Sequence, residues 1–131
     1  MNTPDPDRLN EIGTEIVRAA IRVHRNLGPG LLESAYQTCH VFELRRAGLK
    51  VESEVTLPIE YRDRRIDCGY RVDVIVDGAV VIENKVVDRI LPIHTAQLIT
   101  YLKLSGSRLG YMLNWKVKLM KRGIHRFVNR L

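Results

Sequence analysis

Two carboxylates and one lysine interrupt an apolar stretch of this chain of 131 residues. Asp73, Glu83 and Lys85 lie within residues 71–85, where most of the other side chains are Val or Ile. Charged groups in such a stretch cost free energy to bury unless they are paired or hold a metal ion. Two carboxylates can bind a divalent cation, and a lysine can stabilise negative charge on a phosphate. The three residues are therefore candidate catalytic residues of a magnesium-dependent phosphodiesterase.

The two strands expected here meet at Asp77-Gly78, a dipeptide typical of tight turns. Side chains alternate along a strand, so Glu83 and Lys85 share a face. A two-residue loop would place Asp73 on the opposite face from Glu83, whereas a three-residue loop or a bulge would bring the two carboxylates together. Gly78 can adopt the positive φ that such a loop needs. The catalytic hypothesis therefore predicts that this hairpin does not have a plain two-residue loop.

The apolar pattern predicts the elements that position these residues. Apolar side chains at steps of three and four predict helices over residues 9–27, 31–47 and 92–104. Alternating apolar side chains predict strands over residues 50–61, 66–76, 79–87, 108–115 and 124–128. The order α-α-β-β-β-α-β-β predicts an α/β (α+β) fold, in which a mixed sheet is flanked by helices. At this length, and with no linker or repeat, we expect residues 1–131 to form one domain.

The formal net charge of +6 is unevenly distributed along the chain. All fifteen Asp and Glu residues precede Arg89, whereas the residues from Arg89 to Leu131 include nine Lys or Arg. A one-sided basic surface is expected of a protein that binds a polyanion, although a solvated basic face with no ligand would carry the same charge. The residues that we expect to contact nucleic-acid phosphates are Lys116, Lys118, Lys121, Arg122 and Arg126.

The composition bears on where the protein works. No run approaches the ~18 apolar residues of a membrane span, so we expect no membrane partner. The polar first eleven residues do not have the pattern of a signal peptide. Cys39 and Cys68 lack the spacing of a metal site, and we expect both to be buried free thiols. These features favour a cytoplasmic location.

The catalytic candidates also resemble a known motif. Asp73 followed by Glu83-Asn84-Lys85 resembles the Asp…Glu-x-Lys core of the PD-(D/E)XK nuclease superfamily. The sequence Gly-Leu-Leu-Glu-Ser-Ala-Tyr at residues 30–36 resembles the signature of the GxxExxY protein family, which is assigned to that superfamily. The resemblance extends from about residue 9 to the end of the chain. It implies a restriction-endonuclease-like core and nucleolytic activity.

This resemblance implies a role for each candidate. Asp73 and Glu83 would hold Mg²⁺ or Mn²⁺, hard cations that prefer oxygen ligands, with the main-chain carbonyl of Asn84 as a further ligand. Glu33 would add a carboxylate to the metal shell. Glu33 also has a simpler interpretation, because a carboxylate in the first turn of a helix interacts favourably with the helix dipole. Lys85 would orient or help to deprotonate the attacking water and offset negative charge on the phosphorane.

Further residues either extend the resemblance or depart from it. Gln97 and Tyr101 resemble the Gln-x-x-x-Tyr helix of RecB-like members, which supports the site or contacts the nucleic-acid backbone. Val72 stands where the superfamily has a proline, and Asn84 stands where an apolar residue is usual. A buried amide needs hydrogen-bond partners. We therefore expect a polar neighbour of Asn84 behind the site, or a strand more exposed than its sequence indicates.

Two other functions fit the same residues. In the first, the chain is a nucleic-acid-binding module on a nuclease-like fold that does not cut. In the second, it is a structural or interaction domain in which Lys85 pairs with Glu83 or Asp73, although buried ion pairs contribute little net stability. DNA is favoured over RNA as the partner, but charge directed at the backbone does not separate the two. A homodimer is a further expectation, because a domain this small covers little of a duplex.

Overall fold

The structure is a computed structural model that describes residues 4–129 apart from the side chain of Cys68. Within that range it contains three α-helices, one short 3₁₀ helix and five strands. In chain order they are α1 (Pro6–Leu27), α2 (Glu33–Arg46), β1 (Val51–Tyr61), β2 (Arg64–Val76), β3 (Val80–Lys85), α3 (Pro92–Ser105), β4 (Leu109–Asn114), the 3₁₀ helix (Met120–Arg122) and β5 (Ile124–Val128). Apart from the 3₁₀ helix, this is the order expected from the sequence.

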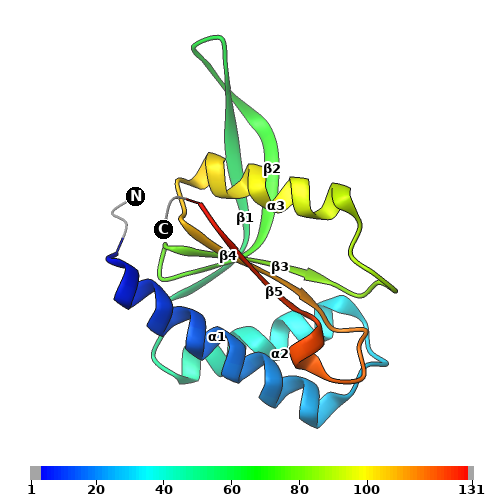
Figure 1. Cartoon of the computed structure of the whole chain (residues 1–131). Coiled ribbons are helices and arrows are strands. Elements are labelled where there is room, and N and C mark those ends of the chain that lie inside the picture. The colour runs from blue at the N-terminus through cyan, green and yellow to red at the C-terminus, as the bar shows by residue number, and fades with distance from the viewer. Residues whose placement is uncertain (1–3, 130–131) are drawn as a thin grey trace.

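The strands form one mixed sheet in the order β1-β2-β3-β4-β5. The β3–β4 pair is parallel, and the other three pairs are antiparallel. Helices α1 and α2 cover one face of the sheet, and α3 covers the other (Figure 1). The predicted α/β (α+β) fold with a mixed sheet flanked by helices is therefore confirmed.

Each face of the sheet has its own apolar core. Valines of β2 and β3 pack with α1, α2 and Trp115 in the larger core, which includes Val74, Val76, Val80 and Ile82. The smaller core lies under α3 and contains Leu57, Val72, Ile75, Val81, Leu98, Tyr101, Leu102 and Met112. Since side chains alternate along a strand and Val81 belongs to this core, residues 81, 83 and 85 of β3 are directed to the α3 face.

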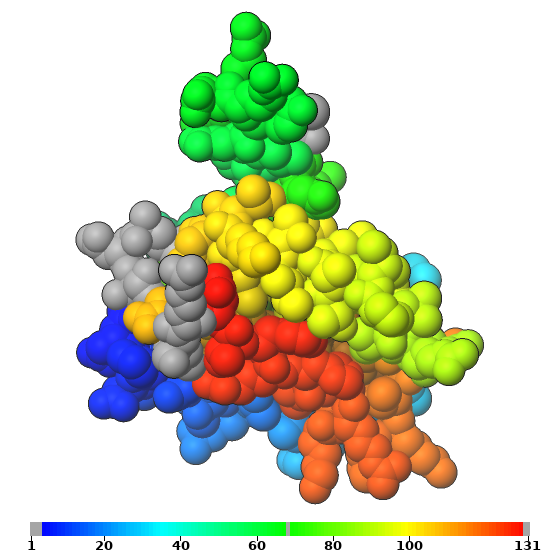
Figure 2. Space-filling view, turned by 45° about the horizontal axis from the view of Figure 1, so that its top comes forward, coloured from blue at the N-terminus to red at the C-terminus, as the bar shows by residue number. Residues whose placement is uncertain are grey.

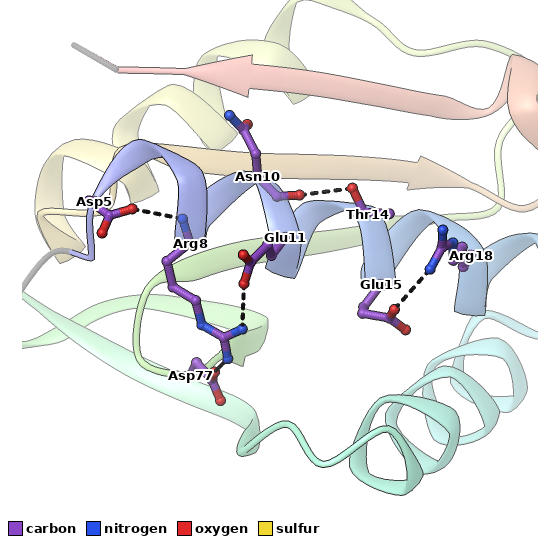
Figure 3. A network of polar contacts seen from close by, with 8 residues as sticks. All are labelled: Asp5, Arg8, Asn10, Glu11, Thr14, Glu15, Arg18 and Asp77. Atoms are coloured by element: carbon purple, nitrogen blue, oxygen red, sulfur yellow. Dashed lines mark hydrogen bonds and ion pairs between the residues drawn. The ribbon is translucent and has the colours of Figure 1, made fainter.

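Helix α1 is fixed at both ends by local sequence. Asp5 caps its first turn by accepting a hydrogen bond from the main-chain N–H of Arg8 (2.9 Å), and Gly28 ends it with φ of 72°. The Arg8 guanidinium donates to Glu11 (3.2 Å) and to Asp77 (3.0 Å), as Figure 3 shows. Arg8 thus ties the start of α1 to the turn between β2 and β3.

That turn sets the register of the β2–β3 hairpin. Val76 pairs with Val80, so three residues form the loop, and both Asp77 (φ 51°) and Gly78 (φ 60°) have positive φ. The Asp77 carboxylate also accepts a hydrogen bond from the main-chain N–H of Lys50 (2.8 Å). The loop is therefore not a plain two-residue one, as the catalytic hypothesis requires.

Strands β1 and β2 continue beyond the rest of the sheet as a projecting two-stranded arm (Figures 1 and 2). We call residues 57–70 the β1–β2 arm. The pairing register shifts between Leu57 and Ile59, at the position of Pro58, a residue that strands accept at edges and bulges. Gly69 lies at this irregularity, where a Cβ atom would come 2.0 Å from the carbonyl oxygen of Leu57.

Two expectations about the whole chain concern cysteines and membranes. Cys39 is a free thiol but is half-buried rather than buried, whereas the side chain of Cys68 lies outside what the structure describes. Within residues 4–129 no helix is both long and apolar enough to cross a membrane.

Gly123 provides a test of the packing at the end of β4. A Cβ atom there would lie 2.0 Å from the carbonyl oxygen of Asn114, so the backbone must move in Gly123→Ala. We expect this variant to lower the free energy of unfolding by about 1–3 kcal/mol, measured by denaturant titration. Gly30→Ala is the matched control, because no atom lies within 4 Å of its Cβ position. Equal stabilities of the two variants would contradict this packing.

Candidate active site

Asp73 and Glu83 lie opposite one another where β2 and β3 separate. The regular ladder ends at Val74 and Ile82. Beyond it, the N–H of Asp73 donates to Glu83 Oε1 (3.0 Å), and the N–H of Asn84 donates to Asp73 Oδ2 (2.8 Å). Carboxylates therefore take the place of carbonyl oxygens as acceptors for these main-chain donors. The three-residue loop thus brings the two acids together on the α3 face.

Burial makes both carboxyl groups harder to ionise. The pKa of Glu83 is raised to about 8, first by burial and then by the negative charge of Asp73. Burial likewise raises the pKa of Asp73, while the hydrogen bond from Asn84 opposes that rise. Two carboxyl groups that are hard to ionise together favour a shared positive charge between them.

Lys85 contributes positive charge near the two acids but forms an ion pair with neither of them. It lies two residues after Glu83 on the same strand face, and its positive charge lowers the pKa values of Glu83 and Asp73. In the described part of the chain, no ion pair includes Lys85. The arrangement therefore differs from the salt-bridge cluster expected of a purely structural domain.

Asn84 points to the opposite face and is fully engaged there. Its Nδ2 donates to Gln37 Oε1 (3.1 Å), and its Oδ1 accepts from Trp115 Nε1 (2.9 Å). The Trp115 ring stacks on Tyr36, with centroids 4.9 Å apart. The polar neighbour expected behind the site therefore exists, and this network fixes the strand that carries Glu83 and Lys85.

Helix α2 and strand β1 add two carboxylates at the edge of the site. Glu33 opens α2, and its negative charge raises the pKa of Glu83 further. The negative charge of Glu54 on β1 raises the pKa of Asp73 in the same way. The backbone of Glu54 has an unusual positive φ of 55°. Gln37, one turn after Glu33, donates to Glu54 Oε1 (2.8 Å) and approaches the carbonyl oxygen of Asp73 (3.4 Å).

These side chains open onto a groove between α2 and β1 with a volume of about 940 Å³. Glu33, Gln37 and Glu54 line one part of it, and Phe42 and Arg45 line another. Sequence reasoning did not single out Gln37 or Glu54. The four-residue spacing from Glu33 could have indicated Gln37, but Glu54 is positioned by strand register, which leaves no local pattern in the sequence.

Helix α3 places Tyr101 beside the acid pair. Its side chain is buried, and its pKa is raised to about 12 by burial and then by the charges of Glu83 and Asp73. Gln97 lies one turn earlier on the same helix and is half-buried. The helix therefore presents Tyr101 toward the site, and its spacing puts Gln97 on the same side.

Four of the five predicted nucleic-acid contacts belong to one segment. Lys116, Lys118, Lys121 and Arg122 are exposed in the connection between β4 and β5. This connection begins beside Lys85, whose carbonyl oxygen accepts from the N–H of Trp115 (2.9 Å), and His24 of α1 contacts the carbonyl of Val117 (2.8 Å).

Arg126 lies apart from these four residues. It is on β5, where it pairs with Tyr111 and donates to Asn10 of α1 (2.9 Å). The side chain of Tyr111 belongs to the core under α1 and α2. Arg126 is therefore on the face of the sheet opposite to the acid pair.

The residues fit a small divalent cation only in part. Within residues 4–129, no three His, Cys, Asp or Glu side chains gather closely enough to form a metal cage. Asp73 Oδ1 and Glu83 Oε2 accept no hydrogen bond from a described residue, so one oxygen of each carboxylate is available to a ligand. Mg²⁺ typically uses one or two protein carboxylates and keeps several waters, which matches this donor set.

The raised pKa of Glu83 has a consequence for stability. Between its ordinary value of 4.5 and about 8, the folded protein holds a proton that the unfolded chain releases, so this group's contribution to stability falls as pH rises through that window. Glu83→Gln keeps an oxygen acceptor and removes the titration. In metal-free buffer, we expect its melting temperature to exceed that of the wild type at pH 8 by more than at pH 5. A difference independent of pH would contradict the raised pKa.

Comparison with known proteins addresses the family of the chain. Searches of curated proteins and of solved structures returned no match. A family model described as the PD-(D/E)XK nuclease superfamily matches residues 10–127. The matched range includes Asp73, Glu83, Lys85 and the helices α2 and α3. The chain therefore belongs to the PD-(D/E)XK nuclease superfamily.

Proposed function

We propose that this chain is a Mg²⁺- or Mn²⁺-dependent nuclease that hydrolyses phosphodiester bonds at Asp73, Glu83 and Lys85. The observation that carries the proposal is the meeting of Asp73 and Glu83 across the β2–β3 hairpin, with Lys85 unpaired on the same face. Membership of the superfamily supports a nuclease-like function and a nucleic-acid substrate.

Asp73 and Glu83 would hold the ion through their free oxygens, with the main-chain carbonyl of Asn84 as a further ligand. Glu33 would act on the ion through a water or as a ligand after a side-chain rotation. A divalent cation held against a phosphate polarises it and lowers the pKa of bound water. Its charge would also favour the ionised form of Glu83, whose pKa is otherwise raised to about 8.

Lys85 would act on the substrate. Because no carboxylate within the described residues holds its ammonium group, that group can interact with the attacking water or with a phosphate oxygen. A preorganised cation at the point where negative charge develops stabilises the transition state. Tyr101 and Gln97 would support the site from α3, with Tyr101 neutral at physiological pH because its pKa is raised to about 12.

The exposed lysines of the β4–β5 connection would guide phosphates toward Lys85 without reading sequence. Arg126, on the opposite face, is the member of the predicted set that fits this role least well. The motif at residues 30–36 is consistent with the GxxExxY family. DNA as the substrate, a homodimer as the acting form and the cytoplasm as the location complete the proposal.

The decisive variants are Asp73→Asn and Lys85→Met, assayed with Mg²⁺ and Mn²⁺ on supercoiled plasmid, linear duplex, single-stranded DNA and RNA. We expect each to reduce cleavage about 100-fold or more, because each removes a charge that the transition state requires. Asp7→Asn and Lys103→Met are matched controls at exposed positions, and they should cut like the wild type.

Titration calorimetry with Mn²⁺ separates the rival functions. We expect binding heat from the wild type and from Lys85→Met, and none from Asp73→Asn. A wild type that binds nucleic acid and cuts no substrate with either metal would favour the binding module. A wild type with neither binding heat nor a metal-dependent rise in melting temperature would favour the structural domain.

A further inference from the structure

The β1–β2 arm projects from the body of the protein beyond α3 (Figures 1 and 2). A lone two-stranded hairpin is marginally stable in water, and such ribbons are usually covered on at least one face. The side chains along this one are largely exposed from Glu60 to Asp67. Its two faces differ in chemistry, and that difference indicates what the arm binds.

The strand register defines three residue pairs along the arm. Leu57 pairs with Tyr70, Ile59 with Ile66, and Tyr61 with Arg64. Directly paired residues of an antiparallel ladder share a face, so Ile59, Ile66, Tyr61 and Arg64 lie on one side of the outer arm, and Leu57 and Tyr70 share a side at its base, below the register shift. We call the surface formed by these three pairs the tyrosine face. Tyr61 is 61% exposed and Tyr70 is 38% exposed.

The opposite face carries two carboxylates beside one arginine. Glu60 pairs with Arg65 across the ladder, and Arg65 also forms an ion pair with Asp67 (2.9 Å). The tyrosine face, in contrast, has one positive residue, Arg64, and no carboxylate. Only the tyrosine face therefore combines exposed aromatic rings with a cation that is not balanced on its own side.

The tyrosine face leads directly to the acid pair. At its base, the Tyr70 and Tyr101 rings meet edge to face, with centroids 5.2 Å apart. Leu57 belongs to the same small core as Tyr101. Tyr101 in turn lies close enough to Glu83 and Asp73 for their charges to raise its pKa. A ligand that follows the arm thus reaches the candidate catalytic residues.

We propose that the tyrosine face binds unpaired nucleotides of the substrate strand on their way to the acid pair, with bases stacked on Tyr61 and Tyr70 and a phosphate at Arg64. The inference deepens the proposed nuclease function and rests on it. Aromatic rings beside a basic side chain are the usual platform for single strands, because every base has a face to stack. Bases within a duplex are already stacked on their neighbours, so the substrate class is single-stranded or locally unpaired nucleic acid.

A second copy of the chain fits this surface less well. If two copies packed through their tyrosine faces, Arg64 would be buried with no carboxylate from either face to pair it, and burying an unpaired charge is costly. A nucleic-acid strand provides a phosphate for Arg64 and bases for the rings. The four residue-to-residue steps from Leu57 to Tyr61 span about 13 Å, enough for a short run of nucleotides.

The test measures binding to a fluorescent single strand of roughly 12 nucleotides and to the matching duplex in metal-free buffer, where no cutting occurs. Tyr61→Thr removes the ring but keeps a residue suited to a strand. We expect it to weaken single-strand binding roughly five- to one-hundred-fold, and Tyr61→Phe to remain within about twofold of the wild type.

Arg64 and Arg65 provide a matched pair on opposite faces. We expect Arg64→Ala to weaken single-strand binding and to reduce its salt dependence, and Arg65→Ala to change neither. Unchanged binding in Tyr61→Thr and Arg64→Ala would overturn the proposal. So would loss of duplex binding alone, which indicates an arm that enters a groove, or a wild-type dimer that Tyr61→Thr converts to a monomer.

Hydrolysis of bis(4-nitrophenyl) phosphate separates this inference from the proposed function. That small diester needs only the acid pair and Lys85, so we expect Tyr61→Thr to hydrolyse it like the wild type while its KM for a single strand rises. A wild type that hydrolyses no diester with either metal refutes the nuclease function. An unchanged KM in Tyr61→Thr refutes only the role of the arm.

Discussion

The register of the β2–β3 hairpin is the constraint on which the rest of this structure depends. A loop of three residues between Val76 and Val80 puts Asp73 opposite Glu83, and a shift of one residue would move one of them to the other face. The loop is held from two sides, since the carboxylate of Asp77 binds both Arg8 of α1 and the main chain of Lys50. Contacts remote from the site thereby determine its geometry.

The site lies where the regular pairing of β2 with β3 ends. Beyond Val74 and Ile82, side-chain carboxylates replace the carbonyl acceptors of a regular ladder, and burial raises the pKa values of Asp73 and Glu83. A stable scaffold would avoid such an arrangement, because like charges repel and buried carboxyl groups are costly. Functional sites often retain local costs of this kind while the surrounding core holds the fold together. Here Trp115, which stacks on Tyr36 and donates a hydrogen bond to the Asn84 side chain, holds the strand in place from behind.

Local periodicity predicted the element order and most boundaries, because burial on one face of a helix or strand leaves a regular signal in the sequence. The turn at Asp77-Gly78 and the partner of Asn84 followed from conformational and hydrogen-bonding requirements of single residues. Glu54 and the tyrosine face could not be predicted in the same way, since both depend on which residues of β1 and β2 lie opposite one another. The charge count in the last third of the chain gave no sign that Arg126 lies on the face of the sheet opposite to the acid pair.

The central claim is that Asp73 and Glu83 share one cation beside Lys85. A crystal structure of the wild type grown with Mn²⁺, with anomalous data that locate the metal, tests it most directly. The account predicts a single strong anomalous peak bonded to one oxygen each of Asp73 and Glu83, at about 2.1–2.2 Å, with Lys85 remaining unpaired. An anomalous map without a peak between the two carboxylates, or a structure in which Lys85 bridges them instead, would contradict it.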